Sequence, residues 1–283
     1  MNIVVSIKQV PDTTNVRIDR STGNLIREGI PAIINPDDLH AIEEAVKIRE
    51  KFGGKVLVIT MGPPMAASAL KEAISQGADE AFLLSDRRFA GADTLATTYT
   101  LYHGIKKIEE KYGTVDLVFT GKQAVDGDTG QVGPGLATRL GYSLIAYVTK
   151  IEEVTPEKVV AWRRLEKGLE KIEAKIPAVL TITSEANEVR YSPLDDMIRA
   201  VKYKPESWDA DLVGADPKKT GILGSPTKVV RTNIPPARAG GEIIANNLPP
   251  EETADKFIEA LLKEEAVKLL EFMEPLVEGD KNG

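Results

Sequence analysis

The chain has 283 residues, of which 42% are hydrophobic, and its 36 Lys and Arg residues against 43 Asp and Glu residues give a formal net charge of −7. This acidic balance argues against nucleic acid or an anionic membrane as the main partner. The chain has no cysteine and only two histidines, His40 and His103. Disulfides, thiolate zinc sites and iron–sulfur ligation by this chain are therefore excluded, and demanding chemistry would depend on a bound cofactor.

The chain shows no targeting or membrane-spanning pattern. The apolar run at its start is interrupted by Lys8 and Pro11 and is too short for the hydrophobic region of a secretory signal. No stretch approaches the ~20 apolar residues that cross a bilayer. We therefore expect a cytoplasmic protein without direct membrane insertion, which would reach a membrane only peripherally, through partner subunits.

The first half of the chain alternates short apolar runs with longer amphipathic segments. The apolar runs predict buried parallel strands at 3–7, 56–59, 81–84 and 117–120. The amphipathic segments predict helices at 37–52, 66–76 and 93–112, and the last two end at Gly77 and Gly113. This alternation indicates right-handed βαβ units and a doubly wound, mostly parallel α/β sheet of the Rossmann-like, adenine-nucleotide α-hydrolase-like kind.

The second half has a different pattern. Between Ser143 and Ser184, apolar and charged residues alternate in segments separated by turn residues, which predicts an antiparallel ribbon added to the sheet, followed by a buried strand at 179–182. Prolines recur between 185 and 250, and a core rarely tolerates that density. We expect three parts: an α/β domain at 1–184, an extended partner-binding arm at 185–250, and a C-terminal helix and tail at 251–283, with the helix reaching about Phe272.

One loop is the strongest candidate for a ligand site. Residues 121–135 leave the strand at 117–120 and enter a helix that ends near Leu140, with four glycines among nine residues. Such a loop can bring backbone N–H groups close to an anion, beside the partial positive charge of a helix N-terminus. The standard dinucleotide and Walker A motifs are absent. The alternative is a glycine-rich turn that holds no ligand.

The expected position of this loop supports a site. If the first four strands take the order 3-2-1-4, the loop after the first strand, Lys8–Thr13, and the glycine-rich loop face one crevice at the switch point. Met61–Pro64, after the second strand, would form a side wall. Asp93, Thr94 and Thr97 are helix caps by default, and in a nucleotide crevice the threonines could also bind a ring carbonyl.

From Met1 to about Glu264, the chain resembles the β subunit of an electron-transfer flavoprotein. The residues that carry the resemblance are Ile7-Lys8-Gln9-Val10-Pro11-Asp12, Asn35-Pro36 with Ala41-Ile42-Glu43-Glu44-Ala45, the loop from Gly121 to Pro134, and Arg190-Tyr191-Ser192-Pro193-Leu194. The family implies a heterodimer with an α subunit that holds one FAD. The β subunit holds either AMP or a second FAD.

The loop is similar to that of the bifurcating and nitrogen-fixation-associated (Fix-like) subtype. Asp126-Gly127-Asp128 replaces the more acidic loop of ordinary members, in which AMP is structural, and Gly127 leaves room for a larger ligand. In this subtype the β-subunit FAD accepts hydride from NADH. Its electrons divide between a higher-potential acceptor, reached through the α-subunit FAD and leading to a quinone or dehydrogenase, and a low-potential ferredoxin-type carrier.

The resemblance also implies specific site residues. No catalytic residue and no metal ligand is expected, and Leu194 is expected to dock a redox partner. The cofactor-binding residues carried over are Ser6, Ile7, Lys8, Gln9, Val10, Asn35, Met61, Gly62, Asp93, Thr94, Thr97, Gly121, Lys122, Gln123, Asp126, Gly127, Asp128, Thr129, Gly130, Gln131 and Val132.

The chain departs from its relatives at two places. Asp37 stands where relatives often carry an aromatic residue, and the tail from about Glu265 is longer than expected. Two other readings remain open. One is an ordinary electron-transfer β subunit that binds structural AMP and serves acyl-CoA dehydrogenases. The other is an ATP-binding regulatory protein on the related fold.

Overall fold

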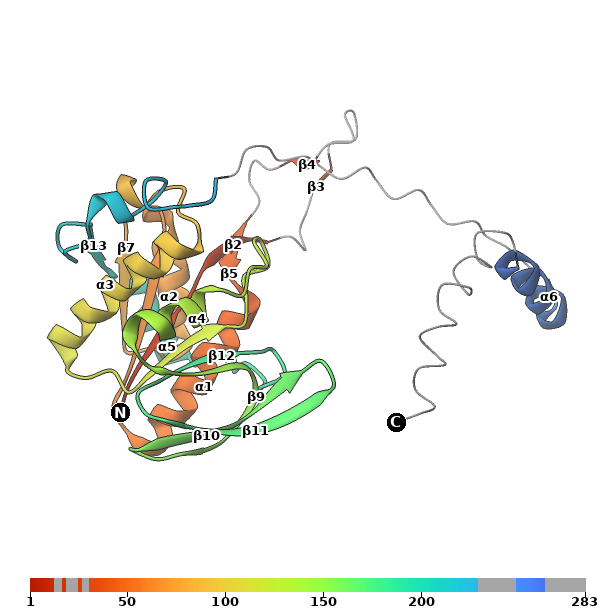
Figure 1. The fold of residues 1–283 in the computed structure, drawn as a ribbon, viewed down its shortest axis with the longest axis horizontal. Coiled ribbons are helices and arrows are strands. Elements are labelled where there is room, and N and C mark those ends of the chain that lie inside the picture. The colour runs from red at the N-terminus through yellow and green to blue at the C-terminus, as the bar shows by residue number, and fades with distance from the viewer. Residues whose placement is uncertain (13–16, 19–24, 27–30, 229–247, 263–283) are drawn as a thin grey trace. The chain divides into compact units, whose positions relative to one another are not determined.

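The computed structural model describes residues 1–12, 17–18, 25–26, 31–228 and 248–262 (Figure 1). The chain divides into two compact units, Met1–Val229 and Val230–Gly283, and each is described here by itself. Thr13 of the predicted crevice, residues 229–247 of the predicted arm and the expected helical residues 263–272 lie outside the described residues, as does the rest of the tail.

A mixed sheet forms the centre of the first unit. Within the described residues nine strands pair in the order β11-β10-β9-β12-β8-β1-β6-β7-β13. The strands are β1 (Asn2–Ser6), β6 (Lys55–Met61), β7 (Glu80–Leu84), β8 (Leu117–Gly121), β9 (Ser143–Val154), β10 (Lys158–Leu165), β11 (Gly168–Lys175), β12 (Ala178–Ile182) and β13 (Glu206–Trp208). The segment β7-β6-β1-β8 is parallel throughout, which confirms the predicted order 3-2-1-4.

Helices cover both faces of this sheet. One core cluster lies under α1 (Pro36–Phe52) and α2 (Ala67–Ser75), with Ile3, Val5 and Val58 pointing into it. The opposite cluster lies under α3 (Thr94–Tyr112) and α4 (Val132–Leu140), where Val4 and Leu57 point. Neighbouring residues of β1 and β6 thus serve opposite faces, as expected for strands buried on both sides. The doubly wound α/β fold is confirmed.

The helix boundaries follow local sequence signals. Pro36 occupies the first turn of α1, Asp37 and Asp38 follow it, and Gly53 ends the helix with φ 72°. Proline and acidic residues suit a helix start, and glycine tolerates the left-handed backbone at its end. Asp93 caps α3, because its side chain accepts the N–H of Ala96. The helix ends at Gly113, as predicted.

The predicted antiparallel ribbon is present, built from β9, β10 and β11 at one edge of the sheet. β9 also runs parallel to β12, which joins the ribbon to the central strands. Two further pairs are short and lie outside this sheet: β2 (Gln9–Pro11) with β5 (Ala32–Ile34), and β3 (Arg17–Ile18) with β4 (Leu25–Ile26).

The prediction of extended chain from residue 185 is wrong for the described part of that segment. Residues 194–202 form α5 (Leu194–Lys202), which packs on α2. β13 adds to the sheet edge beside β7, and buried Trp208 stacks on Phe82 with ring centroids 4.6 Å apart. The compact unit continues to Val229. The prolines here bound short elements that pack on the core, a pattern that a proline count cannot distinguish from an arm.

The second unit contains α6 (Pro250–Leu261), whose start agrees with the predicted helix. Its first turn carries Pro250 and the acidic Glu251 and Glu252, a favourable helix start. In the described ranges of both units, none of the helices combines the length and apolar character needed to cross a bilayer.

Candidate functional site

The predicted loops lie at the carboxyl edge of the parallel strands, where β1 and β8 separate. The two strands pair in register as far as Ser6 and Thr120. Beyond that point, the N–H of Ile7 donates to the carbonyl of Ile59 on β6, and the N–H of Lys122 donates to the carbonyl of Ile182 on β12. The backbones that continue from β1 and β8 therefore diverge, which creates the switch point at which parallel sheets bind ligands.

The first turn of α1 occupies this opening. The carboxylate of Asp38 accepts the N–H of Gly121 at 2.9 Å on Oδ1 and the N–H of Lys8 at 2.7 Å on Oδ2. Asp38 is 5% exposed. Burial raises the pKa of its carboxyl to about 7, although the two N–H donors favour the ionised form.

Asn35 fixes the beginning of the glycine-rich loop. Its side-chain Nδ2 donates to the carbonyl of Gln123 at 2.9 Å, and its Oδ1 accepts the N–H of Val125 at 3.0 Å. Its own backbone N–H donates to the carbonyl of Lys8. One buried amide thus ties the loop after β8 to the loop after β1.

Side chains complete the contacts between the loops. Lys8 Nζ lies 2.7 Å from both carboxylate oxygens of Asp126, so the predicted convergence of the two loops is present. Within the glycine-rich loop, Gln123 Nε2 donates to Asp128 Oδ1 at 2.9 Å. Gln9 Nε2 donates to the Ser68 hydroxyl at 2.8 Å and thereby links the first loop to α2. Met61 is the last residue of β6, and Gly62 follows it.

The glycines of the loop serve two different purposes. A Cβ on Gly121 would lie 2.4 Å from Asp38 Oδ1, and a Cβ on Gly133 would lie 2.3 Å from the Thr181 methyl group. These two glycines permit close packing. Gly127 has nothing within 4 Å of such a Cβ, and Gly130 takes a left-handed φ of 61°. Only the latter two fit the expectation that the glycines open the loop to a ligand.

Four consecutive N–H groups in this loop are available to an anion. The backbone N–H groups of Thr129, Gly130, Gln131 and Val132 have no acceptor among the described residues. Asp128, with φ 48°, precedes them, and α4 begins at Val132. Left-handed residues followed by a helix N-terminus turn N–H groups toward one point.

The first turn of α3 supplies two hydroxyl groups. Within the described ranges, the side chains of Thr94 and Thr97 make no hydrogen bond, so both hydroxyls are able to bind a ligand. Asp93 is different. Its carboxylate accepts the N–H of Ala96 and both the N–H and the hydroxyl of Thr227. The capping role of Asp93 is confirmed, and this side chain is already saturated by protein donors.

The remaining predicted residues line the strand ends or lie elsewhere. Ser6, Ile7 and Val10 are buried, so only their backbone can contribute to a site. Leu194 begins α5, which packs on α2, and is 71% exposed. A hollow of about 230 Å³ lies elsewhere, between α3, α4 and residues 218–224.

Sequence reasoning missed one residue beside the loop. Tyr147 takes a left-handed φ of 59°, which is a strained conformation for a bulky side chain. Its backbone N–H donates to the hydroxyl of Thr181 at 2.8 Å. The Tyr147 hydroxyl lies 3.5 Å from where a Cβ on Gly130 would be. An aromatic residue in a strand gives no local signal of such a conformation.

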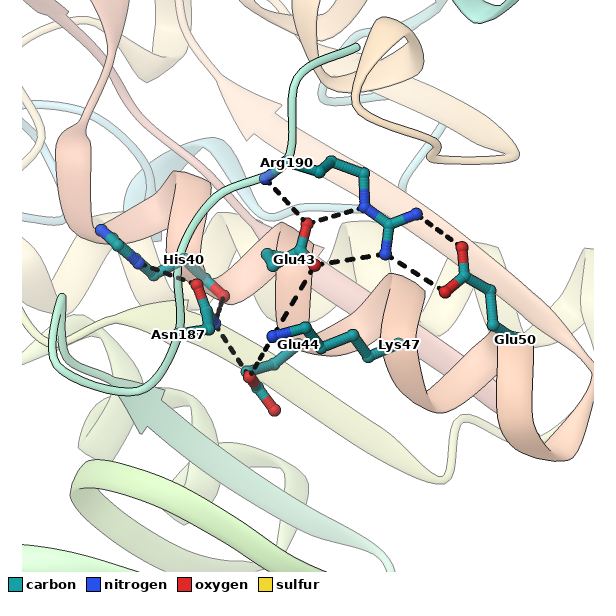
Figure 2. A network of polar contacts seen from close by, with 7 residues as sticks. All are labelled: His40, Glu43, Glu44, Lys47, Glu50, Asn187 and Arg190. Carbon is teal, nitrogen blue, oxygen red and sulfur yellow. Dashed lines mark hydrogen bonds and ion pairs between the residues drawn. The ribbon is translucent and has the colours of Figure 1, made fainter. Parts of the chain in front are cut away.

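A second polar network holds the segment before Leu194 against α1 (Figure 2). Arg190 Nε lies 2.8 Å from Glu43 Oε2, and Arg190 Nη1 lies 2.5 Å from Glu50 Oε1. The side-chain amide of Asn187 donates to Glu44 and to the carbonyl of His40, each at 2.9 Å. His40 is therefore a packing histidine, and the Glu43-Glu44 pair of the sequence motif has a structural role.

Comparison with known proteins agrees with this geometry. Residues 22–212 match the model of the electron transfer flavoprotein domain. The chain is 49% identical over 262 residues to the electron transfer flavoprotein subunit beta of Thermoanaerobacterium thermosaccharolyticum, covering 92% of this chain and 98% of that one. It is 48% identical over 242 residues to the protein FixA of Azotobacter vinelandii, covering 84% and 86%. It is 46% identical over 245 residues to the caffeyl-CoA reductase-Etf complex subunit CarD of Acetobacterium woodii, covering 86% and 92%.

Proposed function

Because the chain belongs to the electron transfer flavoprotein family, as a Fix-like β subunit, we propose that it binds FAD at the carboxyl edge of its sheet and receives hydride from NADH there. The electrons then divide between the FAD of an α subunit, which leads to a quinone or dehydrogenase, and a low-potential ferredoxin-type carrier. The observation that carries the proposal is the row of available N–H groups from Thr129 to Val132.

The residues of the site fit such a cofactor. The N–H row and the N-terminus of α4 suit the pyrophosphate of a dinucleotide. The open space at Gly127 suits a ligand larger than AMP, and the hydroxyls of Thr94 and Thr97 are free to bind a ring carbonyl. A bound flavin supplies the ability to take electrons as a pair and release them singly.

In this proposal the protein binds and orients rather than reacts. Asn35 and Asp38 hold the two loops at a fixed spacing through backbone groups. Lys8 and Asp126 close one end of the site with an ion pair. No side chain of this chain is assigned a catalytic step.

The partners proposed are an α subunit, as in other β subunits of the family, and at least one further redox protein. The name of the Acetobacterium relative places that protein in a caffeyl-CoA reductase-Etf complex, which supports assembly of this chain into a larger complex. Leu194 begins an exposed apolar stripe that continues through Met197, Ile198 and Val201 on α5. We assign this stripe to docking of the redox partner.

The cofactor is tested by denaturing the purified α/β dimer and measuring the released nucleotides. We expect two FAD and no AMP per dimer. One FAD and one AMP would contradict the proposal and support the ordinary AMP-binding β subunit. Gly127→Asp should lower FAD retention without lowering the thermal midpoint, because a Cβ at this position has no protein atom within 4 Å. Val125→Asp adds the same charge two residues earlier, at an exposed position, and is the matched control.

The docking surface is tested by Leu194→Ala in the same dimer. Flavin content and reduction by NADH should be unchanged, while electron transfer to the partner slows. Leu169→Ala, at an exposed position on β11, is the control. Equal loss of NADH reduction in the Leu194 variant would indicate a structural role.

A further inference from the structure

The two loops of the candidate site are held together by side chains, among them Asp38, and not by the sheet. After Ser6 and Thr120, the backbone of β1 turns to β6 and that of β8 turns to β12. The N–H groups of Lys8 and Gly121 consequently have no strand partner at the point where the strands part. Both donate to the carboxylate of Asp38.

The two N–H donors at this position favour the ionised form of the carboxyl, against the effect of its burial. Two N–H donors need two acceptor oxygens, and a protonated carboxyl or an amide offers only one oxygen without hydrogen. The fit is close, because a Cβ on Gly121 would lie 2.4 Å from Asp38 Oδ1. Among the described residues, no lysine or arginine side chain pairs with Asp38. The nearby Lys8 Nζ pairs with Asp126 instead.

We propose that Asp38 is a positioning residue of the nucleotide site: its ionised carboxylate ties the loop after β1 to the loop after β8 and sets the spacing that a nucleotide requires. The proposal rests on the proposed function in one respect, that the ligand is an adenine nucleotide. It holds equally for FAD and for AMP, because both would place phosphate at the glycine-rich loop.

The proposal predicts a pH dependence of nucleotide binding. Burial raises the pKa of Asp38 to about 7. As the pH falls from 8 to 6 the carboxylate takes up a proton, the hydrogen bond that the protonated oxygen accepts is weakened, and affinity falls. The other charged groups around this turn are Asp37 and His40 from α1, Lys122 from the glycine-rich loop, and the ion pair of Lys8 with Asp126. All are also present in an Asp38→Asn variant, so the difference between the two proteins reports Asp38.

The test measures dissociation constants of isotopically labelled AMP and FAD from pH 6 to 8.5, using the α/β complex freed of β-site nucleotide. We expect Asp38→Asn to bind at least about tenfold more weakly than the wild type at pH 8, the effect of one hydrogen bond to a charged group. The wild type should lose affinity toward pH 6, and the variant should show a flatter profile. Asp116→Asn is the matched control, because Asp116 accepts the N–H of Asn2 at 2.8 Å at the opposite end of the same two strands. It should behave as the wild type.

Wild-type affinity in Asp38→Asn at pH 8, or an unchanged pH profile, would overturn the proposal. If that variant fails to fold, the wild-type profile decides, since affinity for AMP that is constant from pH 6 to 8 is incompatible with the assigned role. Binding of AMP without FAD would contradict the proposed FAD function and leave the Asp38 test intact. A wild type that binds neither nucleotide would overturn both.

Discussion

Of the four carboxylates that helix α1 buries, Asp38 and Glu43 lie five positions apart and are compensated in different ways. Asp38, 5% exposed, is held by the backbone N–H groups of two loops. Glu43, 4% exposed, is held by the guanidinium and the backbone N–H of Arg190. The first arrangement keeps an anion beside a candidate ligand site without a cation. The second uses a cation to fix the segment that leads to Leu194. From this comparison we expect ionised Asp38 to lower the free energy of unfolding and the pairing of Glu43 with Arg190 to raise it.

The largest expected effect is the pH dependence of stability caused by Asp38. Its pKa rises on folding from 3.8 to about 7, so between these values the native state holds a proton that the unfolded state has released. The free energy of unfolding therefore falls as the pH rises through this window, by about 4 kcal/mol at ~1.4 kcal/mol per unit. Urea unfolding of the wild type and of Asp38→Asn from pH 4 to 8 measures the difference.

Other carboxylates shift the opposite way and must be separated from this effect. At Asp86 and Glu50, hydrogen bonds from Arg88 and Arg190 lower the carboxyl pKa by more than burial raises it. Their contribution to stability is present above their ordinary pKa values, 4.5 for Glu50 and 3.8 for Asp86, and is lost below them, so it overlaps only the acid end of the Asp38 window. Subtracting the Asp38→Asn curve removes it. A difference that does not change with pH between 4 and 7 would show that burial of Asp38 carries no such cost.

The second prediction concerns Arg190, the cation that pairs with buried Glu43. Arg190→Ala leaves Glu43 buried without its partner, and we expect a loss of about 3 kcal/mol in the free energy of unfolding. Adding Glu43→Gln should recover part of this loss, because the unpaired charge is then gone. Lys47→Ala is the control, since Lys47 is exposed and lies 3.7 Å from Glu43. If Arg190→Ala lowers the free energy of unfolding no more than Lys47→Ala does, the proposed difference between Asp38 and Glu43 is wrong.

The smallest effect concerns the exposed pair of Lys8 and Asp126, whose side chains are 50% and 32% exposed. Such pairs contribute roughly 0–1 kcal/mol to stability, so Lys8→Met and Asp126→Asn should each leave the urea midpoint nearly unchanged. Any effect on nucleotide retention then reports the site itself. If either variant destabilises the protein as much as Arg190→Ala, exposure does not decide the strength of these contacts.

The central sheet and the position of the site could be predicted from sequence because their signals are local. Apolar runs such as Val56–Ile59 and helix stops such as Gly113 define elements independently of what they contact. Given those elements, parallel pairing brings Lys8 and Asp126 to the same edge, as found. The glycine-rich loop was recognisable by composition and by its family motif.

The rest depends on partners distant in sequence. Nothing near Trp208 indicates that it will stack on Phe82, and the prolines around it favoured an extended reading. Asp38 falls within the predicted helix at 37–52, and the sequence gives no sign of its role because its two donors are 30 and 83 residues away. Tyr147, in its left-handed conformation, donates its N–H to Thr181, which is 34 residues away. Such roles become visible only when the strands are in place.

The division among the glycines has a consequence for how the family can diversify. Gly121 and Gly133 are enclosed by neighbouring atoms, so replacing them would disturb the framework itself. Gly127 has no such neighbour and no left-handed backbone, so almost any side chain can be introduced there at little structural cost. In the proposed function Gly127 borders the nucleotide, so a single substitution there would change the surroundings of the ligand without disturbing the framework. This position would then offer natural variation, and laboratory evolution, a direct route between cofactors.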